Sequence, residues 1–351
     1  MSDGPMHRSR EVAGVMQSES CSRLPERRPG ADRYRNHRMS AMHALNTMAV
    51  CFVPLLPDSV VAGMSRCFFA GDTLEDAIRR VCSLNADGFS ATLDYLGDAP
   101  AKGDEVRTSA EPYFDLIDAI ERNNLDAEVA IKPSVLGEQA KETRSTEWVE
   151  SIIARAGRAN VVVRIDVEDV RLAHSGRDVT ERCLGKHRNV SFALRAGIPR
   201  TDSILASLAI QRLDAGTNNV LHRENPVRLV AGAVGSRGEL PSHFLRHAER
   251  CFEADLFVTI ATHDEKLIDD VVAHILRRGV DRARFEFQVV LGVREDLRDR
   301  LRQTGFRVRV YVPFGKNRYG YSTRLFNEHP DAMWRGIGAL FLNPARAEYS
   351  R

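Results

Sequence analysis

The sequence is poor in lysine and lacks the cysteine patterns that mark particular classes of protein. Lysine supplies six of the 50 basic residues, so each lysine is a candidate for a specific role. The six cysteines form no C-x-x-C pair and no regular framework, which favours reduced thiols in a reducing compartment. We therefore expect a cytoplasmic protein without structural disulfides.

Long apolar runs are also missing. The longest apolar stretch near the start, residues 48–64, is interrupted by Pro54, Pro57 and Asp58, whereas a membrane-spanning helix needs about 20 apolar residues in succession. The first residues do not contain the apolar core of a signal peptide. We expect neither a transmembrane helix nor a secretory signal.

Several motifs that would point to particular chemistry are absent. No G-x-G-x-x-G follows the first expected strand, and neither a P-loop nor a G-x-S-x-G occurs. These absences argue against a dinucleotide-binding open sheet, phosphoryl transfer and acyl transfer. His263 stands beside Asp264, but no second histidine lies at ligand spacing, so we expect no metal site.

The charge is nearly balanced, with a formal net charge of +2, so we expect no nucleic-acid partner. Residues 1–44 contain eight arginines, no lysine and five acidic residues, and they show no apolar period. We predict a basic, disordered tail over residues 1–44, an N-terminal helical segment over residues 45–87 and a catalytic barrel over residues 88–351.

From residue 45 onward the pattern becomes regular. Apolar residues recur at helical spacing over residues 74–85, after Thr73, which is suited to cap a helix. Eight short apolar strands then alternate with helical segments, which predicts a closed (β/α)8 barrel of parallel strands, with an open doubly wound sheet as the alternative. The predicted strands cover residues 88–96, 127–135, 160–168, 189–197, 227–234, 256–263, 284–292 and 307–314.

Charged and amide side chains interrupt these apolar strands. Burying them is costly without partners, so they form either a structural network inside the barrel or a ligand site, and five of them, spread over four strands, favour the ligand site. Cations outnumber anions near the strand ends, which suits an anionic ligand such as a carboxylate, a phosphate or a reduced flavin. The five interrupting residues are Lys132, Asp166, Arg228, Glu286 and Gln288; the charged residues near the strand ends also include Arg164, Glu168, Arg195 and Arg324.

The order of the motifs resembles the bacterial, FAD-dependent proline dehydrogenases from about residue 66 to about residue 334. The similar stretches are GDTLEDAIRRVCSLNADGFSATLDYLGD, IKPSVLG, VRIDVED, PVRLVAGAV, VTIATHD, FEFQVVLGV and RVRVYVPFGKNRYGYSTRLFNEHPDAMW. The resemblance implies a (β/α)8 barrel that holds FAD at the carboxyl ends of its strands. It also implies oxidation of the proline ring beside nitrogen by hydride transfer to FAD, with electrons passing to a quinone at the membrane surface.

The resemblance further implies roles for particular residues. Lys132 matches a lysine that holds the substrate carboxylate, Asp166 an acid of the same network, and Arg228 an arginine beside the flavin. Thr262, His263 and Gln288 match cofactor contacts, and we expect Gly232 to contact the cofactor as well. Arg195, also expected to bind the cofactor, stands where the family's fourth strand usually carries glutamine. On the last helix, Arg324 matches a carboxylate-binding arginine, while Tyr321 and Glu328 match further substrate-site residues.

Some positions depart from the family pattern. Leu325 replaces the second of two adjacent arginines, Val234 replaces a tyrosine of the pocket, Ala231 replaces a lysine, and Gly197 replaces a tyrosine near Arg195. These changes predict a larger and less polar pocket. The alternatives to an ordinary proline dehydrogenase are therefore a tailoring flavoenzyme for a modified or larger cyclic amine, and an inactive flavin-binding barrel.

Overall fold

The computed structural model describes residues 53–97, 104–132, 143–166, 187–196, 199–214, 227–230 and 240–341. The chain divides into the units Met1–Asn46 and Thr47–Arg351, and every described residue belongs to the second unit. The predicted tail over residues 1–44, Gly197, and the residues from Ala231 to Val234 that include Gly232 lie outside the described residues.

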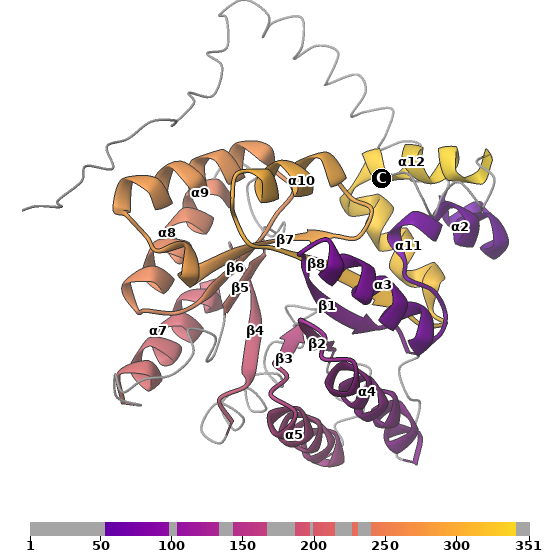
Figure 1. The fold of residues 1–351 in the computed structure, drawn as a ribbon, viewed down its shortest axis with the longest axis horizontal. Coiled ribbons are helices and arrows are strands. Elements are labelled where there is room, and N and C mark those ends of the chain that lie inside the picture. Colours follow the sequence, from indigo (N-terminus) through magenta and orange to yellow (C-terminus); the bar gives the residue numbers. More distant parts are fainter. Residues whose placement is uncertain are drawn as a thin grey trace, which may run out of the picture. The chain divides into compact units, whose positions relative to one another are not determined.

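Eight parallel strands close into a barrel in sequence order, with β1 paired to both β2 and β8 (Figure 1). This confirms the predicted (β/α)8 fold, and each strand lies within its predicted range. The strands are β1 (Ser90–Tyr95), β2 (Ala127–Ile131), β3 (Val163–Asp166), β4 (Val190–Arg195), β5 (Val227–Val230), β6 (Val258–Ala261), β7 (Phe285–Val290) and β8 (Val308–Phe314).

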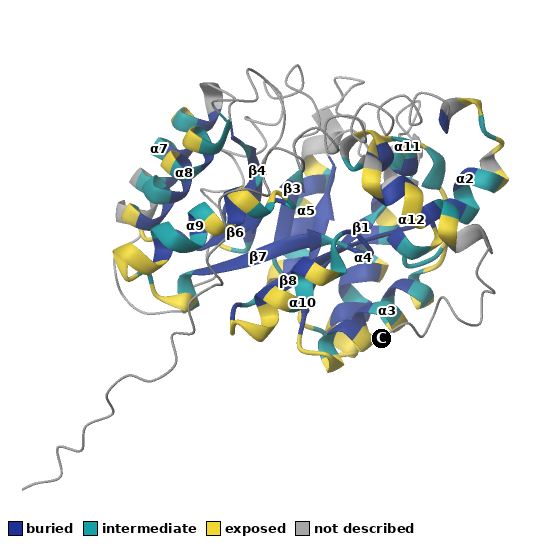
Figure 2. Cartoon of the chain, turned by 90° about the horizontal axis from the view of Figure 1, so that it is seen from above, coloured by how far each residue is buried: buried dark blue, intermediate teal, exposed yellow. Residues whose placement is uncertain are grey.

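Helices surround the strands and bury their apolar faces against them (Figure 2). The described helices are α2 (Asp58–Met64), α3 (Leu74–Ala86), α4 (Asp104–Arg122), α5 (Thr143–Arg158), α7 (Pro199–Asp214), α8 (Leu240–Glu253), α9 (Glu265–Arg278), α10 (Glu295–Gln303), α11 (Arg318–Glu328) and α12 (Pro330–Phe341). Short 3-10 turns are η1 (Val53–Leu55), η2 (Arg66–Phe68) and η6 (Arg282–Arg284).

Local sequence explains where these helices begin. The Thr73 side chain accepts a hydrogen bond from the Asp76 backbone N–H, and the Asp76 side chain accepts one from the backbone of Thr73, forming a capping box. The helix over residues 74–85 is therefore confirmed as α3. Asp264 caps α9 in a similar way, by accepting from the backbone N–H groups of Lys266 and Leu267, so this residue beside His263 has a structural task.

The strands alternate between an outward apolar face and an inward polar face. On β1, Ala91 and Leu93 join the core shared with the helices, whereas Thr92 and Asp94 carry polar side chains that are fully buried. Because successive side chains of a strand point to opposite faces, the polar residues of all eight strands meet inside the barrel. A second apolar cluster joins α2, α11 and α12 beside the barrel (Figure 1).

Candidate active site

Two charged groups at the carboxyl ends of β1 and β2 form a buried ion pair. Asp94 is on β1, and Lys132 directly follows β2; the Lys132 ammonium contacts both carboxylate oxygens of Asp94. Asp94 is fully buried and Lys132 is 7% exposed. Burial raises the pKa of Asp94 above its ordinary value, although Lys132 acts in the opposite direction. The predicted substrate lysine therefore reaches the site already paired with a carboxylate.

A second group joins β3, β5 and β8. Asp166 ends β3, and the Arg228 guanidinium donates from Nη1 to its two carboxylate oxygens at 3.0 and 3.1 Å. The Tyr311 hydroxyl donates to Asp166 at 3.0 Å, and the Arg228 guanidinium lies 4.8 Å from the Tyr311 ring centroid. Burial, with Asp94 and Asp166 nearby, raises the pKa of Tyr311 well above its ordinary value, so its hydroxyl stays protonated and remains a donor.

Tyr311 is a functional candidate that the sequence analysis missed. It occupies the inward face of β8, between Arg309 and Pro313, while Val310 and Val312 face the helices. The alternation with period two along this strand was the signal that would have identified it.

The predicted cofactor residues of β6 lie beside this group. His263 follows β6, its Nε2 accepts from the Val290 backbone N–H at 3.0 Å, and its ring centroid is 4.6 Å from that of His329. Burial, followed by the charges of His329 and Arg294, lowers the pKa of His263 to about 3. His263 is therefore neutral at physiological pH, with its proton on Nδ1. Thr262 is buried, and its hydroxyl accepts from the Asp264 backbone N–H at 3.2 Å.

The described residues contain no cluster of three or more histidine, cysteine, aspartate or glutamate side chains that could hold a metal ion.

The last predicted residues come from α11 and β4. Tyr321 lies near Tyr311, whose titration it affects, and its ring centroid is 6.5 Å from that of Phe69. Arg324 is exposed on the same helix, and Arg195 ends β4 half-buried. The side chain of Glu328 lies outside the described residues.

The position of Leu325 bears on specificity. This residue is 4% exposed and packs in the apolar cluster of α2, α11 and α12 with Val53, Phe326 and Met333. A leucine there contributes packing and cannot donate a hydrogen bond to a carboxylate.

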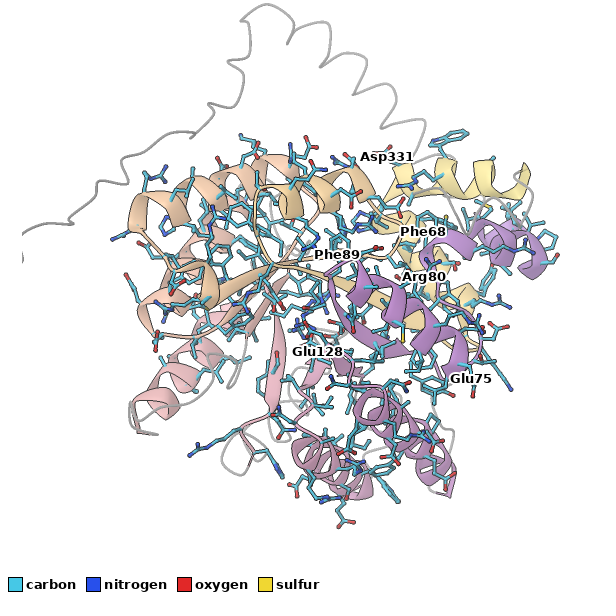
Figure 3. All side chains as sticks on the ribbon, viewed as in Figure 1. Phe68, Glu75, Arg80, Phe89, Glu128 and Asp331 are labelled. Carbon is cyan, nitrogen blue, oxygen red and sulfur yellow. The ribbon has the colours of Figure 1, made fainter. Side chains whose placement is uncertain are left out.

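Two residues that the sequence analysis grouped with the strand ends are placed elsewhere, which corrects that interpretation. Arg164 is fully buried and pairs with Glu128, and Glu286 pairs with Arg309, whose Nε donates to it at 2.6 Å. Arg164 points inward like Asp166 but lies two residues earlier on β3, about 6–7 Å deeper along the strand. This interior network is a structural set of paired charges beneath the site. Figure 3 labels Glu128 within the ring of helices.

Thr92 and Gln288 connect the interior network to the strand ends. The Thr92 hydroxyl donates to Glu128 at 2.6 Å, and Gln288 Nε2 donates to the Thr92 oxygen at 2.7 Å. Gln288 pairs in register with Ala261, which directly precedes Thr262 and His263. A predicted cofactor residue is therefore held from below by Thr92 and Glu128, which the sequence analysis did not select.

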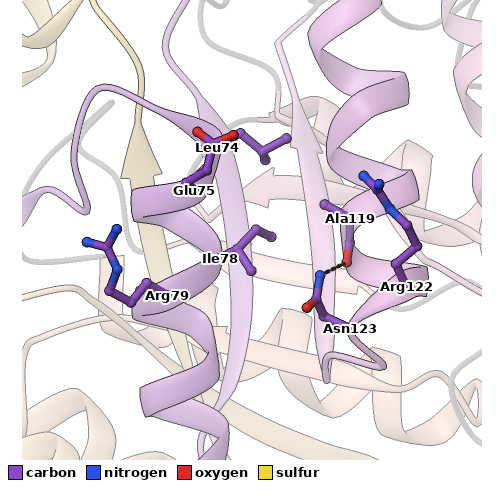
Figure 4. Close-up of a pocket in the computed structure, with 7 residues that line it drawn as sticks. All are labelled: Leu74, Glu75, Ile78, Arg79, Ala119, Arg122 and Asn123. Carbon is purple, nitrogen blue, oxygen red and sulfur yellow. Dashed lines mark hydrogen bonds between the residues drawn. The ribbon is translucent and has the colours of Figure 1, made fainter.

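A shallow groove on the outer layer, between α3 and α4, is unrelated to this site (Figure 4). Its lining residues are Leu74, Glu75, Ile78, Arg79, Ala119, Arg122 and Asn123. None of the predicted site residues lines it, so we assign it no part in the chemistry.

A parallel (β/α)8 barrel with buried charged side chains gathered at the carboxyl ends of its strands has the architecture of a barrel enzyme. The family model described as proline dehydrogenase matches residues 241–322. Proline dehydrogenase of Deinococcus radiodurans is 32% identical over 278 residues, covering 75% of this chain and 85% of the relative. Proline dehydrogenase 1 of Bacillus subtilis strain 168 is 26% identical over 266 residues, covering 76% and 87%. The chain belongs to the proline dehydrogenase family.

Solved structures support the same fold. Proline utilization A from Bdellovibrio bacteriovorus matches with a TM-score of 0.68 at 16% identity, over 82% of this chain and 35% of that chain. The corresponding protein from Corynebacterium freiburgense matches with a TM-score of 0.62 at 15% identity, over 89% and 35%. This chain therefore spans about one third of those longer proteins and shares the barrel with them.

Proposed function

We propose that this protein is an oxidoreductase that oxidises the C–N bond of proline to an imine. The observation that carries this proposal is the set of buried and partly buried polar groups formed by two ion pairs, Asp94–Lys132 and Asp166–Arg228, and the Tyr311 hydroxyl, in a chain of this family. Oxidation removes a hydride from the ring carbon beside nitrogen and a proton from the nitrogen. A site for this reaction must hold the substrate carboxylate and keep water away from the reacting carbon, and buried cations at the barrel mouth suit both tasks.

FAD is the cofactor that we propose for this site. Arg228 Nε and Gln288 Oε1 are buried and have no hydrogen-bond partner in the described part of the chain. One atom donates and the other accepts, and a flavin ring presents both acceptors and donors. Arg228 and Gln288 would therefore hold the ring, together with Arg195, Gly232, Thr262 and His263. When bound, FAD supplies the hydride acceptor.

The chain's own residues bind and orient the substrate in this proposal. Lys132 and Arg324 bind the carboxylate, and Tyr321 and Glu328 are further candidates for the substrate site on α11, the helix that carries Arg324. Asp166 holds the Arg228 guanidinium, because Nη1 donates to both carboxylate oxygens, and the Tyr311 hydroxyl donates to Asp166 and fixes that carboxylate in turn. His263 stays neutral, which lets it serve as a hydrogen-bonding wall of the cofactor pocket without adding charge.

Leu325 supports a second candidate, a tailoring flavoenzyme that acts on a modified or larger cyclic amine. Its burial in an apolar cluster means that α11 contributes one arginine, Arg324, to the carboxylate site where the family pattern has two adjacent arginines. Charged hydrogen bonds contribute on the order of 1.5–3 kcal/mol each, so free proline would bind at least tenfold more weakly.

The electron acceptor belongs to the same proposal. A quinone at the membrane surface is the acceptor that the family resemblance implies, which would place the protein in the cytoplasm with a peripheral membrane contact. In the residues described above, no helix is long and apolar enough to cross a membrane.

A spectrum of the purified protein tests the proposal. We expect the absorption of oxidised flavin, release of the flavin by acid denaturation, and bleaching when L-proline is added. A protein that binds no flavin would refute the proposal, and one whose flavin no cyclic amino acid bleaches would be the inactive barrel.

A substrate panel separates the two enzymatic candidates. Proline, hydroxyproline, pipecolate and proline amide are compared in the wild type and in Leu325→Arg. Preference for proline amide in the wild type, reversed by Leu325→Arg, would identify the tailoring enzyme; preference for free proline in both would identify an ordinary proline dehydrogenase. Lys132→Met should raise the Michaelis constant for carboxylate substrates while leaving flavin content unchanged.

A further inference from the structure

We propose that Glu128 and Thr92 are positioning residues that fix the Gln288 side-chain amide with its carbonyl oxygen presented to the bound cofactor. This inference rests on the proposed FAD binding and adds to it two residues that touch no ligand. It depends on the direction of each hydrogen bond in the series Glu128, Thr92, Gln288, all of which are buried.

The direction is set at Glu128. Burial alone would raise the pKa of this carboxyl group, but Arg164 and Arg309 outweigh it and lower the pKa to about 2. The carboxylate contacts the Arg164 guanidinium and is therefore ionised at neutral pH, and an ionised carboxylate only accepts hydrogen bonds. The contact of 2.6 Å between the Thr92 hydroxyl and Glu128 Oε1 must consequently use the threonine proton.

The next bond follows from the first. A threonine hydroxyl has a single proton, so once that proton points to Glu128, the oxygen of Thr92 can only accept. The Gln288 atom 2.7 Å away must then be the amide nitrogen. This assignment comes from the network, and it settles the orientation that the shape of an amide group leaves ambiguous.

The consequence lies at the other end of the amide. With its nitrogen committed to Thr92, Gln288 turns Oε1 away from the network, and this atom is buried without a partner among the described residues. Gln288 sits beside Ala261 in the register of β6 and β7, next to the proposed cofactor contacts Thr262 and His263. A buried acceptor without a donor is unfavourable by itself, so its role is to receive an N–H group of a ligand. A flavin ring offers such a donor.

Thr259 provides a matched control within the same network. Its hydroxyl donates a hydrogen bond to Glu286 at 2.9 Å and accepts one from Arg164 Nη2 at 3.4 Å. Like Thr92 it is fully buried, but it makes no hydrogen bond with Gln288. Replacing either threonine by valine removes one hydroxyl from one carboxylate of the interior network, and only Thr92 orients the amide.

The experiment measures the dissociation constant of FAD from the apoprotein by quenching of flavin fluorescence. Thr92→Val should weaken FAD binding about tenfold relative to wild type. Thr92→Ser, which keeps the hydroxyl, and the control Thr259→Val should each bind FAD within about twofold of wild type. Equal binding by Thr92→Val and wild type would overturn the inference, and so would equal weakening by the two valine variants.

A double variant keeps the test decisive if a single substitution also disturbs packing. Gln288→Leu removes the group that the series orients, so adding Thr92→Val to Gln288→Leu should cause no further weakening. Additive losses would show that Thr92 acts on FAD binding by another route and would refute the inference. Failure of the wild-type protein itself to bind FAD would instead refute the proposed function.

Discussion

Replacing Arg164 by methionine should reveal how strongly the barrel depends on its interior charges. The Arg164 side chain is 0% exposed and pairs with Glu128, whose side chain is 6% exposed. Methionine has a comparable length and no charge. The substitution therefore fills most of the space while leaving Glu128 with Arg309, whose Nε lies 3.7 Å away, as its remaining described cation.

The magnitude follows from the electrostatics of Glu128. Burial would raise its pKa, yet Arg164 and Arg309 lower it from the ordinary value of 4.5 to about 2, which corresponds to about 3 kcal/mol. Removing one partner of a buried pair costs about 3–5 kcal/mol because the other charge stays in the interior. We expect Arg164→Met to lower the unfolding free energy by about 3–5 kcal/mol at pH 7.

The pH dependence has a definite sign. A carboxyl group whose pKa is lower in the folded state stabilises the protein above its unfolded pKa and loses that contribution as the pH falls toward the folded value. For Glu128 this window runs from 4.5 down to about 2. The difference in unfolding free energy between wild type and Arg164→Met should therefore become smaller as the pH falls through this window.

Urea unfolding, followed by circular dichroism, measures the effect. The control is Arg79→Met, because the Arg79 side chain is 76% exposed in its ion pair with Asp76, and exposed pairs contribute about 0–1 kcal/mol. A loss in Arg164→Met no larger than that in Arg79→Met would contradict the reasoning, since it would mean that the buried carboxylate finds solvent or another partner.

Other expectations concern the site, the backbone and the thiols. Tyr311→Phe removes a donor to the partly buried Asp166 carboxylate and should lower kcat/KM about tenfold with flavin content unchanged; normal kinetics would exclude a role in the site. Gly292→Ala should lose more than about 1 kcal/mol of unfolding free energy, because Gly292 has φ of 73° and an added Cβ would meet a backbone oxygen, whereas Gly338→Ala, with open space around it, should not. A thiol reagent at pH 8 should modify exposed Cys82 and leave Cys251 unmodified, because Cys251 is buried and its pKa is raised to about 12. Mass spectrometry of the treated native protein locates the modified thiol, and modification of Cys251 before Cys82 would contradict this expectation.

The barrel could be predicted from the sequence because its signals are local. Each strand is a short apolar run followed by a helical segment, and Thr73 marks the start of α3 by a capping pattern within four residues. Among fully described segments the predicted strands were longer than the observed ones: the strand predicted over residues 256–263 is β6, Val258–Ala261.

The interior network could not be predicted with the same success, because its contacts join distant residues. Arg164 and Asp166 are two positions apart on β3 and point to the same face of the strand, so the sequence alone assigns both to the site. Only the tilt and stagger of the closed barrel decide that Asp166 meets Arg228 and Tyr311 while Arg164 meets Glu128 one layer deeper. Glu128, near the start of β2, resembles an ordinary surface residue in the sequence.

The two polar layers have separable tasks, and replacing the buried pair by apolar residues should separate them. In Glu128→Leu/Arg164→Met the interior keeps a balanced charge, because Arg309 remains paired with Glu286. Apolar replacement of a buried ion pair is often neutral for stability, so the double variant should recover most of the unfolding free energy that Arg164→Met loses. The Thr92 hydroxyl, however, loses its carboxylate acceptor and is free to donate to the Gln288 amide, which then turns. We expect recovered stability together with FAD binding about tenfold weaker than wild type. Recovery of both stability and FAD affinity would show that the interior charges support the barrel alone.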